Sequence, residues 1–155
     1  MNAMVALRCA VRRTVVVPEL NVLFFSIQLH FMWEMLQVPF YAGLPGMKHW
    51  EGIQMCLRAT FGDAGIALLA FWCAALVSRT RQWFCWRNRT ALWVYVGVGL
   101  FATILLERLA TGPAQRWVYA PAMPIVPLLG VGLSPIMQWL VLPPLVLLIT
   151  RRQLR

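Results

Sequence analysis

The chain has 155 residues, of which 61% are hydrophobic and only 12% are charged, and its mean hydropathy is +0.69. Soluble domains carry roughly a quarter charged residues, so this chain has too little polar surface to cover a soluble core. The composition excludes an ordinary soluble domain and predicts a single multi-pass membrane domain over residues 1–155.

The formal net charge of +9 follows the pattern of a membrane protein. Cytoplasmic loops carry an excess of arginine and lysine, and ten of the fourteen basic residues fall in alternate connections between apolar stretches. These ten are Arg8, Arg12, Arg13, Arg79, Arg81, Arg87, Arg89, Arg151, Arg152 and Arg155. Their positions predict that both termini lie in the cytoplasm. Because topology accounts for the charge, no nucleic-acid partner is expected.

Four stretches are apolar and long enough to cross a membrane as helices, which takes about 20 residues each. In chain order they cover about residues 20–40, 55–77, 91–110 and 128–149. Because a helix is the simplest way to satisfy the backbone within lipid, the predicted fold class is all-α. The predicted architecture is a four-transmembrane-helix bundle.

Prolines and glycines set the last stretch apart from the other three. It contains Gly130, Gly132, Pro135 and the pair Pro143-Pro144. Proline inside a helix removes a backbone hydrogen bond and bends or interrupts it. The fourth helix is therefore predicted to be kinked and proline-interrupted, preceded by an ordered loop at the membrane surface.

Glu34, Asp63 and Glu107 are three of only five acidic residues, and each lies within an apolar stretch. A carboxylate in hydrocarbon costs a few kcal/mol or more, so such acids usually face the bundle interior and mark a site. With helices of alternating direction, all three fall roughly 5–12 Å below the outer boundary. The sequence thus predicts one carboxylate layer in the outer half of the bundle.

Other polar residues share the helix faces of these acids. On the first helix, His30, Gln37 and Tyr41 lie on the face of Glu34, at spacings of three or four residues. Thr103 lies four residues before Glu107. In the last helix, the polar pair consists of Ser134 and Gln138. A polar cavity lined from several helices is the arrangement that these spacings favour.

Arg58 and Arg108 are the arginines expected nearest to this layer. Two arginines do not neutralise three buried acids, so one carboxyl is expected to stay protonated through desolvation. A neutral carboxylic acid in an apolar cavity is a competent general acid.

Structural interpretations stand beside the functional one. Glu34 would pair with Arg58 or hydrogen-bond another helix. Asp63 would mark a close helix crossing. Glu107 would form a snorkelling pair with Arg108 near the interface.

Neither a metal nor a cofactor is expected. His30 and His49 are the only histidines, too few for a histidine-rich di-iron site. The four cysteines contain no CxxC pair, which leaves zinc binding without support. No phosphate-binding glycine loop, GxSxG or HExxH motif occurs.

Three segments carry a resemblance to a group of small bacterial multi-pass integral membrane proteins of uncharacterised activity. They are His30–Gln37, Gly62–Ala64 and Gly130–Trp139. This resemblance covers most of the chain and implies a bacterial inner-membrane location, but it brings no activity with it.

A looser resemblance is to the membrane carotenoid (lycopene) cyclases. Those proteins show a helix glutamate followed by Trp-x-Tyr and a proline-rich stretch, matched here by Glu107, Trp117-Val118-Tyr119 and the prolines from Pro121 to Pro127. The second glutamate that follows the prolines in the cyclases has no counterpart here, because no acid occurs after Glu107. The resemblance implies acid–base chemistry on an isoprenoid.

The predicted function is binding of, or acid–base chemistry on, an apolar lipid or isoprenoid-like molecule. Glu34 or Asp63 would protonate it, and Glu107 would stabilise the resulting cation. The predicted binding residues are His30, Gln37, Arg58, Arg108, Trp117, Tyr119, Ser134 and Gln138. The alternative is a non-enzymatic accessory subunit of another membrane protein, or a small transporter, whose acids hold helices together or relay ions.

Overall fold

A computed structural model describes residues 17–84 and 88–154. Five arginines used in the topology argument, at positions 8, 12, 13, 87 and 155, lie outside the described residues. The remaining five are within them.

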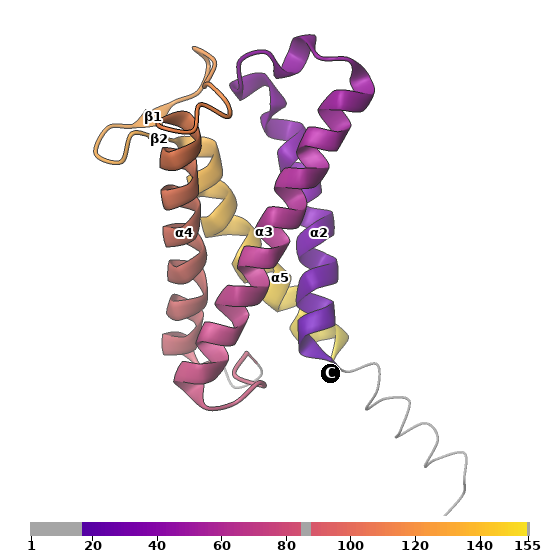
Figure 1. The fold of residues 1–155 in the computed structure, drawn as a ribbon. Coiled ribbons are helices and arrows are strands. Elements are labelled where there is room, and N and C mark those ends of the chain that lie inside the picture. Colours follow the sequence, from indigo (N-terminus) through magenta and orange to yellow (C-terminus); the bar gives the residue numbers. More distant parts are fainter. Residues whose placement is uncertain (1–16, 85–87, 155) are drawn as a thin grey trace, which may run out of the picture.

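Four α-helices make up most of the described chain (Figure 1). They are α2 (Pro18–Gln37), α3 (His49–Ser78), α4 (Arg89–Thr111) and α5 (Leu133–Gln153). α2 and α4 each pack against both α3 and α5, so the helices form a closed four-helix bundle. The prediction of an all-α fold is confirmed.

Three of these helices, α3, α4 and α5, are long and apolar enough to cross a membrane. This supports the prediction of a membrane protein. α2 has 20 residues, about 30 Å of helix, but is not among the three found in the described chain.

Polar residues on the inward face of α2 account for its lower hydropathy. Ser26, His30 and Glu34 are buried in the bundle. On the opposite face, Met32 is 62% and Leu36 73% exposed. A soluble protein buries its apolar face and exposes its polar one, and α2 does the reverse, which suits an apolar solvent.

Local sequence sets the helix ends. α2 stops at Gln37, and residues Val38–Phe40 continue as a short 3-10 helix, η1, that contains Pro39. α3 starts at His49, earlier than the apolar stretch alone indicates, and has 30 residues. At the start of α4, the Asn88 side chain accepts a hydrogen bond from the Ala91 N–H at 3.1 Å, a typical N-cap.

The loops after α2 and α4 join at one end of the bundle, which we call the outer end after the orientation predicted from the arginines. Tyr41 and Tyr119 form an antiparallel β-bridge. The Ala42 N–H donates to the Val118 carbonyl at 2.8 Å. A second 3-10 helix, η2 (Leu44–Gly46), follows in the first loop. The outer loops are therefore fixed to each other by backbone contacts.

A short hairpin precedes α5. Its strands are β1 (Ile125–Val126) and β2 (Val131–Gly132), with Ile125 opposite Gly132. α5 therefore starts at Leu133, after the first residues of the predicted stretch. It continues as one helix through Pro143 and Pro144.

The opposite, inner half of the bundle contains the apolar core. Phe71, Trp83 and Tyr95 are almost fully buried, and the Trp83 ring lies 5.6 Å from each of the other two. Beneath this core, Arg81 binds Glu19 through two hydrogen bonds of 2.8 and 2.7 Å. The inner loop is thereby tied to the first turn of α2.

Candidate functional site

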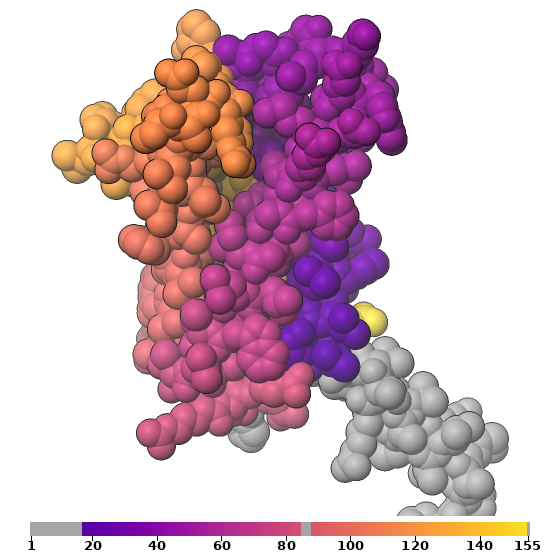
Figure 2. All heavy atoms as spheres, viewed as in Figure 1, coloured from indigo at the N-terminus to yellow at the C-terminus, as the bar shows by residue number. Residues whose placement is uncertain are grey.

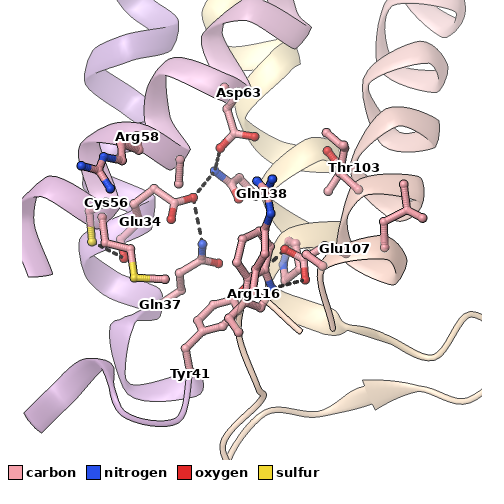
Figure 3. Close-up of a pocket in the computed structure, with 18 of the residues that line it drawn as sticks. Glu34, Gln37, Tyr41, Cys56, Arg58, Asp63, Thr103, Glu107, Arg116 and Gln138 are labelled. Atoms are coloured by element: carbon pink, nitrogen blue, oxygen red, sulfur yellow. Dashed lines mark hydrogen bonds between the residues drawn. The ribbon is translucent and has the colours of Figure 1, made fainter. Parts of the chain in front are cut away.

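A cavity of about 760 Å³ lies in the outer half of the bundle (Figure 3). Its walls come from all four helices and from the loop after α4. Small-molecule sites usually measure about 300–1,000 Å³. Glu34, Asp63 and Glu107, the three acids predicted to share a layer, all line this cavity.

Gln138 of α5 joins the acids of α2 and α3. Its Nε2 donates to Glu34 Oε1 at 3.2 Å and to Asp63 Oδ2 at 3.0 Å. The same nitrogen lies 2.9 Å from His30 Nδ1, and His30 Nδ1 lies 3.3 Å from Asp63 Oδ2. One amide therefore contacts groups from two other helices at a single point.

The hydrogens around Gln138 can be assigned from the contacts of its amide. An amide carries two N–H hydrogens, whereas Gln138 Nε2 lies near three atoms: Glu34 Oε1, Asp63 Oδ2 and His30 Nδ1. A His30 tautomer with its hydrogen on Nδ1 can donate to Asp63 Oδ2 at 3.3 Å, which leaves the two amide hydrogens for Glu34 and Asp63. The four groups thus form one hydrogen-bonded cluster between α2, α3 and α5.

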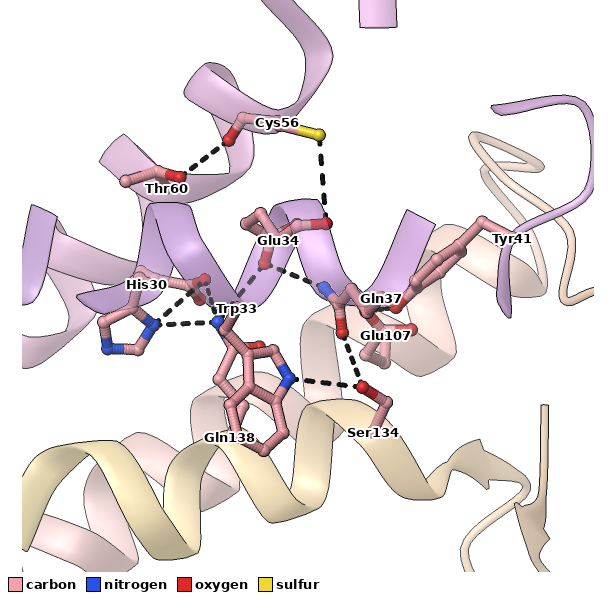
Figure 4. A network of polar contacts seen from close by, with 11 residues as sticks. His30, Trp33, Glu34, Gln37, Tyr41, Cys56, Thr60, Glu107, Ser134 and Gln138 are labelled. Carbon is pink, nitrogen blue, oxygen red and sulfur yellow. Dashed lines mark hydrogen bonds and ion pairs between the residues drawn. The ribbon is translucent and has the colours of Figure 1, made fainter. Parts of the chain in front are cut away.

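A second chain of hydrogen bonds orients Glu34 from the outer side (Figure 4). Gln37 Nε2 donates to Glu34 Oε1 at 2.8 Å. Ser134 Oγ donates to Gln37 Oε1 at 2.9 Å, and Trp33 Nε1 donates to Ser134 Oγ at 3.2 Å. Gln37 lines the cavity, while Ser134 and Trp33 lie behind it. These two hold Gln37, which in turn positions Glu34.

Glu107 is surrounded by three neutral donors from the outer loops. Tyr41 donates to its Oε1 at 3.3 Å, and Trp117 donates to its Oε2 at 3.3 Å. The Tyr119 hydroxyl donates to the same Oε2. Burial raises the pKa of Tyr119 and that of Tyr41, so both hydroxyls keep the proton that they donate.

One carboxyl oxygen of Glu34, on α2, and one of Asp63, on α3, are free to bind a ligand. Glu34 Oε2 and Asp63 Oδ1 make no hydrogen bond to the described chain, and both residues line the cavity. Thr103 lines the same space, but its Oγ1 is buried and has no partner among the described residues. A ligand in the cavity would therefore find the two carboxyl oxygens rather than this hydroxyl.

The arginine pairs considered from the sequence do not form. Within the described residues, the carboxylates within 4 Å of a basic group are Asp63, beside His30, and Glu19, beside Arg81. Arg58 is exposed and lines the cavity, as does Arg116, which sequence reasoning missed. Arg108, predicted as a binding residue, is exposed and does not line it.

The remaining predicted binding residues divide by position. Trp117 lines the cavity. Tyr119 reaches it only through Glu107. His30 is fully buried behind Asp63, and its Nε2 has no partner in the described chain. Cys56 lines the cavity as well, although nothing in its sequence context indicated this.

The cavity opens sideways between the outer halves of α3 and α4. Where α3 and α4 border it, the exposed lining residues include Ala59 and Gly62 of α3, and Leu106 and Leu109 of α4. Figure 2 shows a hollow on this face, between the outer part of α3 and the region where α4 meets its loop. In a membrane, such an opening would face the acyl chains.

Comparisons with family models, curated proteins and solved structures found no match to this chain.

Proposed function

We propose that this protein binds an apolar lipid or isoprenoid-like molecule in the outer-half cavity and acts on it by acid–base chemistry. The observation that carries the proposal is the pairing of Glu34 and Asp63. Each has one oxygen fixed by Gln138 and the other without a partner in the described chain, in a cavity that both line. A fixed carboxyl with a free oxygen beside the ligand is the arrangement that general acid–base catalysis requires.

The proposed setting is a bacterial inner membrane, with α2 as a fourth span and both termini in the cytoplasm. The packing of α2 against α3 and α5 supports a fourth span, as do its apolar outward residues. A bend at Pro143-Pro144 in α5 is part of this proposal, because neither proline supplies a backbone N–H. Reporter fusions after Arg89 and Arg155 should both report the cytoplasm, and a periplasmic signal would contradict this topology.

In the proposed mechanism, Glu34 or Asp63 donates a proton from its free oxygen to the ligand. Gln138 holds the two carboxyls in place, and His30 exchanges a proton with Asp63. Positive charge that develops on the ligand is stabilised by Glu107. Fixed charges are effective in such a site because little water screens them.

The test removes the titrating group and keeps its shape. Glu34→Gln and Asp63→Asn should still insert and fold, and should lose turnover of whichever lipid co-purifies with the wild-type protein. Lipid extracts of wild type and variants, compared by mass spectrometry, identify that molecule and its product. Glu51→Gln is the matched control, because Glu51 is exposed in the first turn of α3. Unchanged turnover in both variants would reject acid–base chemistry.

One observation favours the alternative of a purely structural cluster, namely that Gln138 contacts groups of two other helices. If the acids only hold helices together, Glu34→Gln and Asp63→Asn should lower the thermal unfolding midpoint, and no lipid should be turned over. If they are catalytic, folded yield should persist while turnover is lost.

A further inference from the structure

We propose that the ligand of this cavity is a lipid with a phosphate-bearing headgroup, which enters sideways from the outer leaflet between α3 and α4. This inference rests on the proposed function and adds the headgroup chemistry and the entry route to it.

The first step concerns the entry route. Ala59 and Gly62 of α3, and Leu106 and Leu109 of α4, are exposed and line the cavity. A Cβ atom added at Gly62 would meet nothing within 4 Å. The gap between the two helices is therefore bordered by small or apolar side chains, so an acyl or prenyl chain can lie in it without desolvating a polar group.

The second step concerns charge. Arg58, on α3, and Arg116, in the loop after α4, line the same cavity from two sides (Figure 3). Neither forms an ion pair with an acid of the described chain. Guanidinium groups bind phosphate through paired, charge-assisted hydrogen bonds. These two arginines are the cavity residues to which a phosphate group would bind.

The third step concerns the acids, which would otherwise repel a phosphate. Three neutral donors stabilise the charge of Glu107, and the Gln138 amide donates to both Glu34 and Asp63. Arg58 precedes Asp63 by five residues on α3, about 7.5 Å of helix. Arg58 therefore lies nearer the outer end than Asp63 does, while Glu34, whose carbonyl contacts Cys56, lies level with a position two residues further out than Arg58 along α3.

Together these features predict which part of the ligand lies where in the cavity. Its phosphate lies at the arginines, its chain leaves between α3 and α4, and the atoms next to the phosphate face Glu34 and Asp63. Free phosphate would gain nothing from the apolar walls formed by Met55, Ile66 and Leu106. A chain without phosphate would leave both arginines unpaired. A phospholipid-type molecule has both a chain for the apolar walls and a phosphate for the arginines.

Native mass spectrometry of the full chain in detergent tests the headgroup. The probes are phosphatidic acid, diacylglycerol with the same acyl chains, and inorganic phosphate. Phosphatidic acid should bind, and inorganic phosphate should not. Diacylglycerol should bind more than tenfold more weakly than phosphatidic acid, because it loses the charge-assisted hydrogen bonds of both arginines. Arg58→Gln and Arg116→Gln should each weaken phosphatidic acid about tenfold. Arg108→Gln, exposed but outside the cavity, should leave its binding unchanged.

The route is tested in the same assay with two glycines of α3. Gly62 lines the cavity, whereas Gly65 does not, and a Cβ atom at either would meet nothing within 4 Å. Gly62→Leu should lower phosphatidic acid binding severalfold, and Gly65→Leu should not. Equal binding by both variants would overturn the entry route.

The outcomes separate this inference from the proposed function. If diacylglycerol and phosphatidic acid bind equally, and Gly62→Leu weakens both, the phosphate inference is wrong and the cavity still holds an apolar ligand. Binding of phosphatidic acid by the wild type that Arg58→Gln and Arg116→Gln leave unchanged also overturns the phosphate inference. If no lipid binds, both the inference and the proposed function fail.

Discussion

The outer and inner halves of this bundle are built from the same helices in opposite ways. In the inner half, α3 presents Ala67, Ala70 and Ala74 to the core, all of them buried. The rings of Phe71, Trp83 and Tyr95 pack in the same core. In the outer half, the same helix presents Gly62 and Asp63 to a cavity of about 760 Å³. Small residues let helices approach closely within a membrane, and the buried alanines of α3 allow this in the inner half. The outer half is open instead, because it holds the cavity.

This difference suggests that stability and ligand binding are separated along the helix axis. Tight apolar packing gives many dispersion contacts. Around a cavity there are fewer of them, and polar atoms are accessible to a ligand. Loss of packed side chains in the inner half should therefore lower stability most, whereas hydrogen-bonded polar groups should matter for stability mainly in the outer half. The predictions below test this from the largest expected effect to the smallest.

The largest effect is expected for Trp83→Ala. Trp83 is 1% exposed and packs on Phe71 and Tyr95, so its truncation should cost about 3–5 kcal/mol. The thermal unfolding midpoint in detergent, followed by circular dichroism, measures the loss. Trp93→Ala is the control, because Trp93 is 72% exposed. A loss no larger than that of the control would contradict an inner half that holds the fold together.

A smaller loss is expected for Gly99→Ala at the crossing of α4 and α5. A Cβ atom on Gly99 would lie 1.9 Å from Trp139 Cζ3, and Trp139 is fully buried. Overpacking of this kind costs about 1–3 kcal/mol. Gly97→Ala, where an added Cβ meets nothing within 4 Å, should be neutral or slightly stabilising. Equal midpoints for the two variants would show that the crossing is looser than described.

The depth of the acids could be predicted from sequence because it depends only on helix direction and rise. Glu34, Asp63 and Glu107 lie on three helices of alternating direction, and the structure brings all three to one cavity. The face shared by His30, Glu34 and Gln37 follows from helical periodicity in the same way.

Gln138, Trp117 and Tyr119 were predicted as site residues, but which acid each one contacts could not be read from the sequence. The same holds for Glu19, an acid outside the cavity, which binds Arg81, 62 residues away, because their pairing depends on how the inner loop folds back. Arg116 reaches the cavity because the loop after α4 is fixed to the loop after α2. Arg58 and Arg108 were assigned to acids by proximity in depth, but depth alone does not tell which side of a helix an arginine occupies.

The smallest effect compares one hydroxyl from each half. Tyr119→Phe removes a donor to Glu107, while Tyr41 and Trp117 remain, so the loss should be about 1–2 kcal/mol. Tyr95→Phe removes a buried hydroxyl of the inner half that has no partner among the described residues. That change should be neutral or stabilising, because an unsatisfied buried polar group is costly. Thermal midpoints of both variants, measured in the same detergent, test the pair. If Tyr95→Phe loses as much stability as Tyr119→Phe, polar groups contribute equally in both halves, and the division between a packed inner half and a polar outer half is wrong.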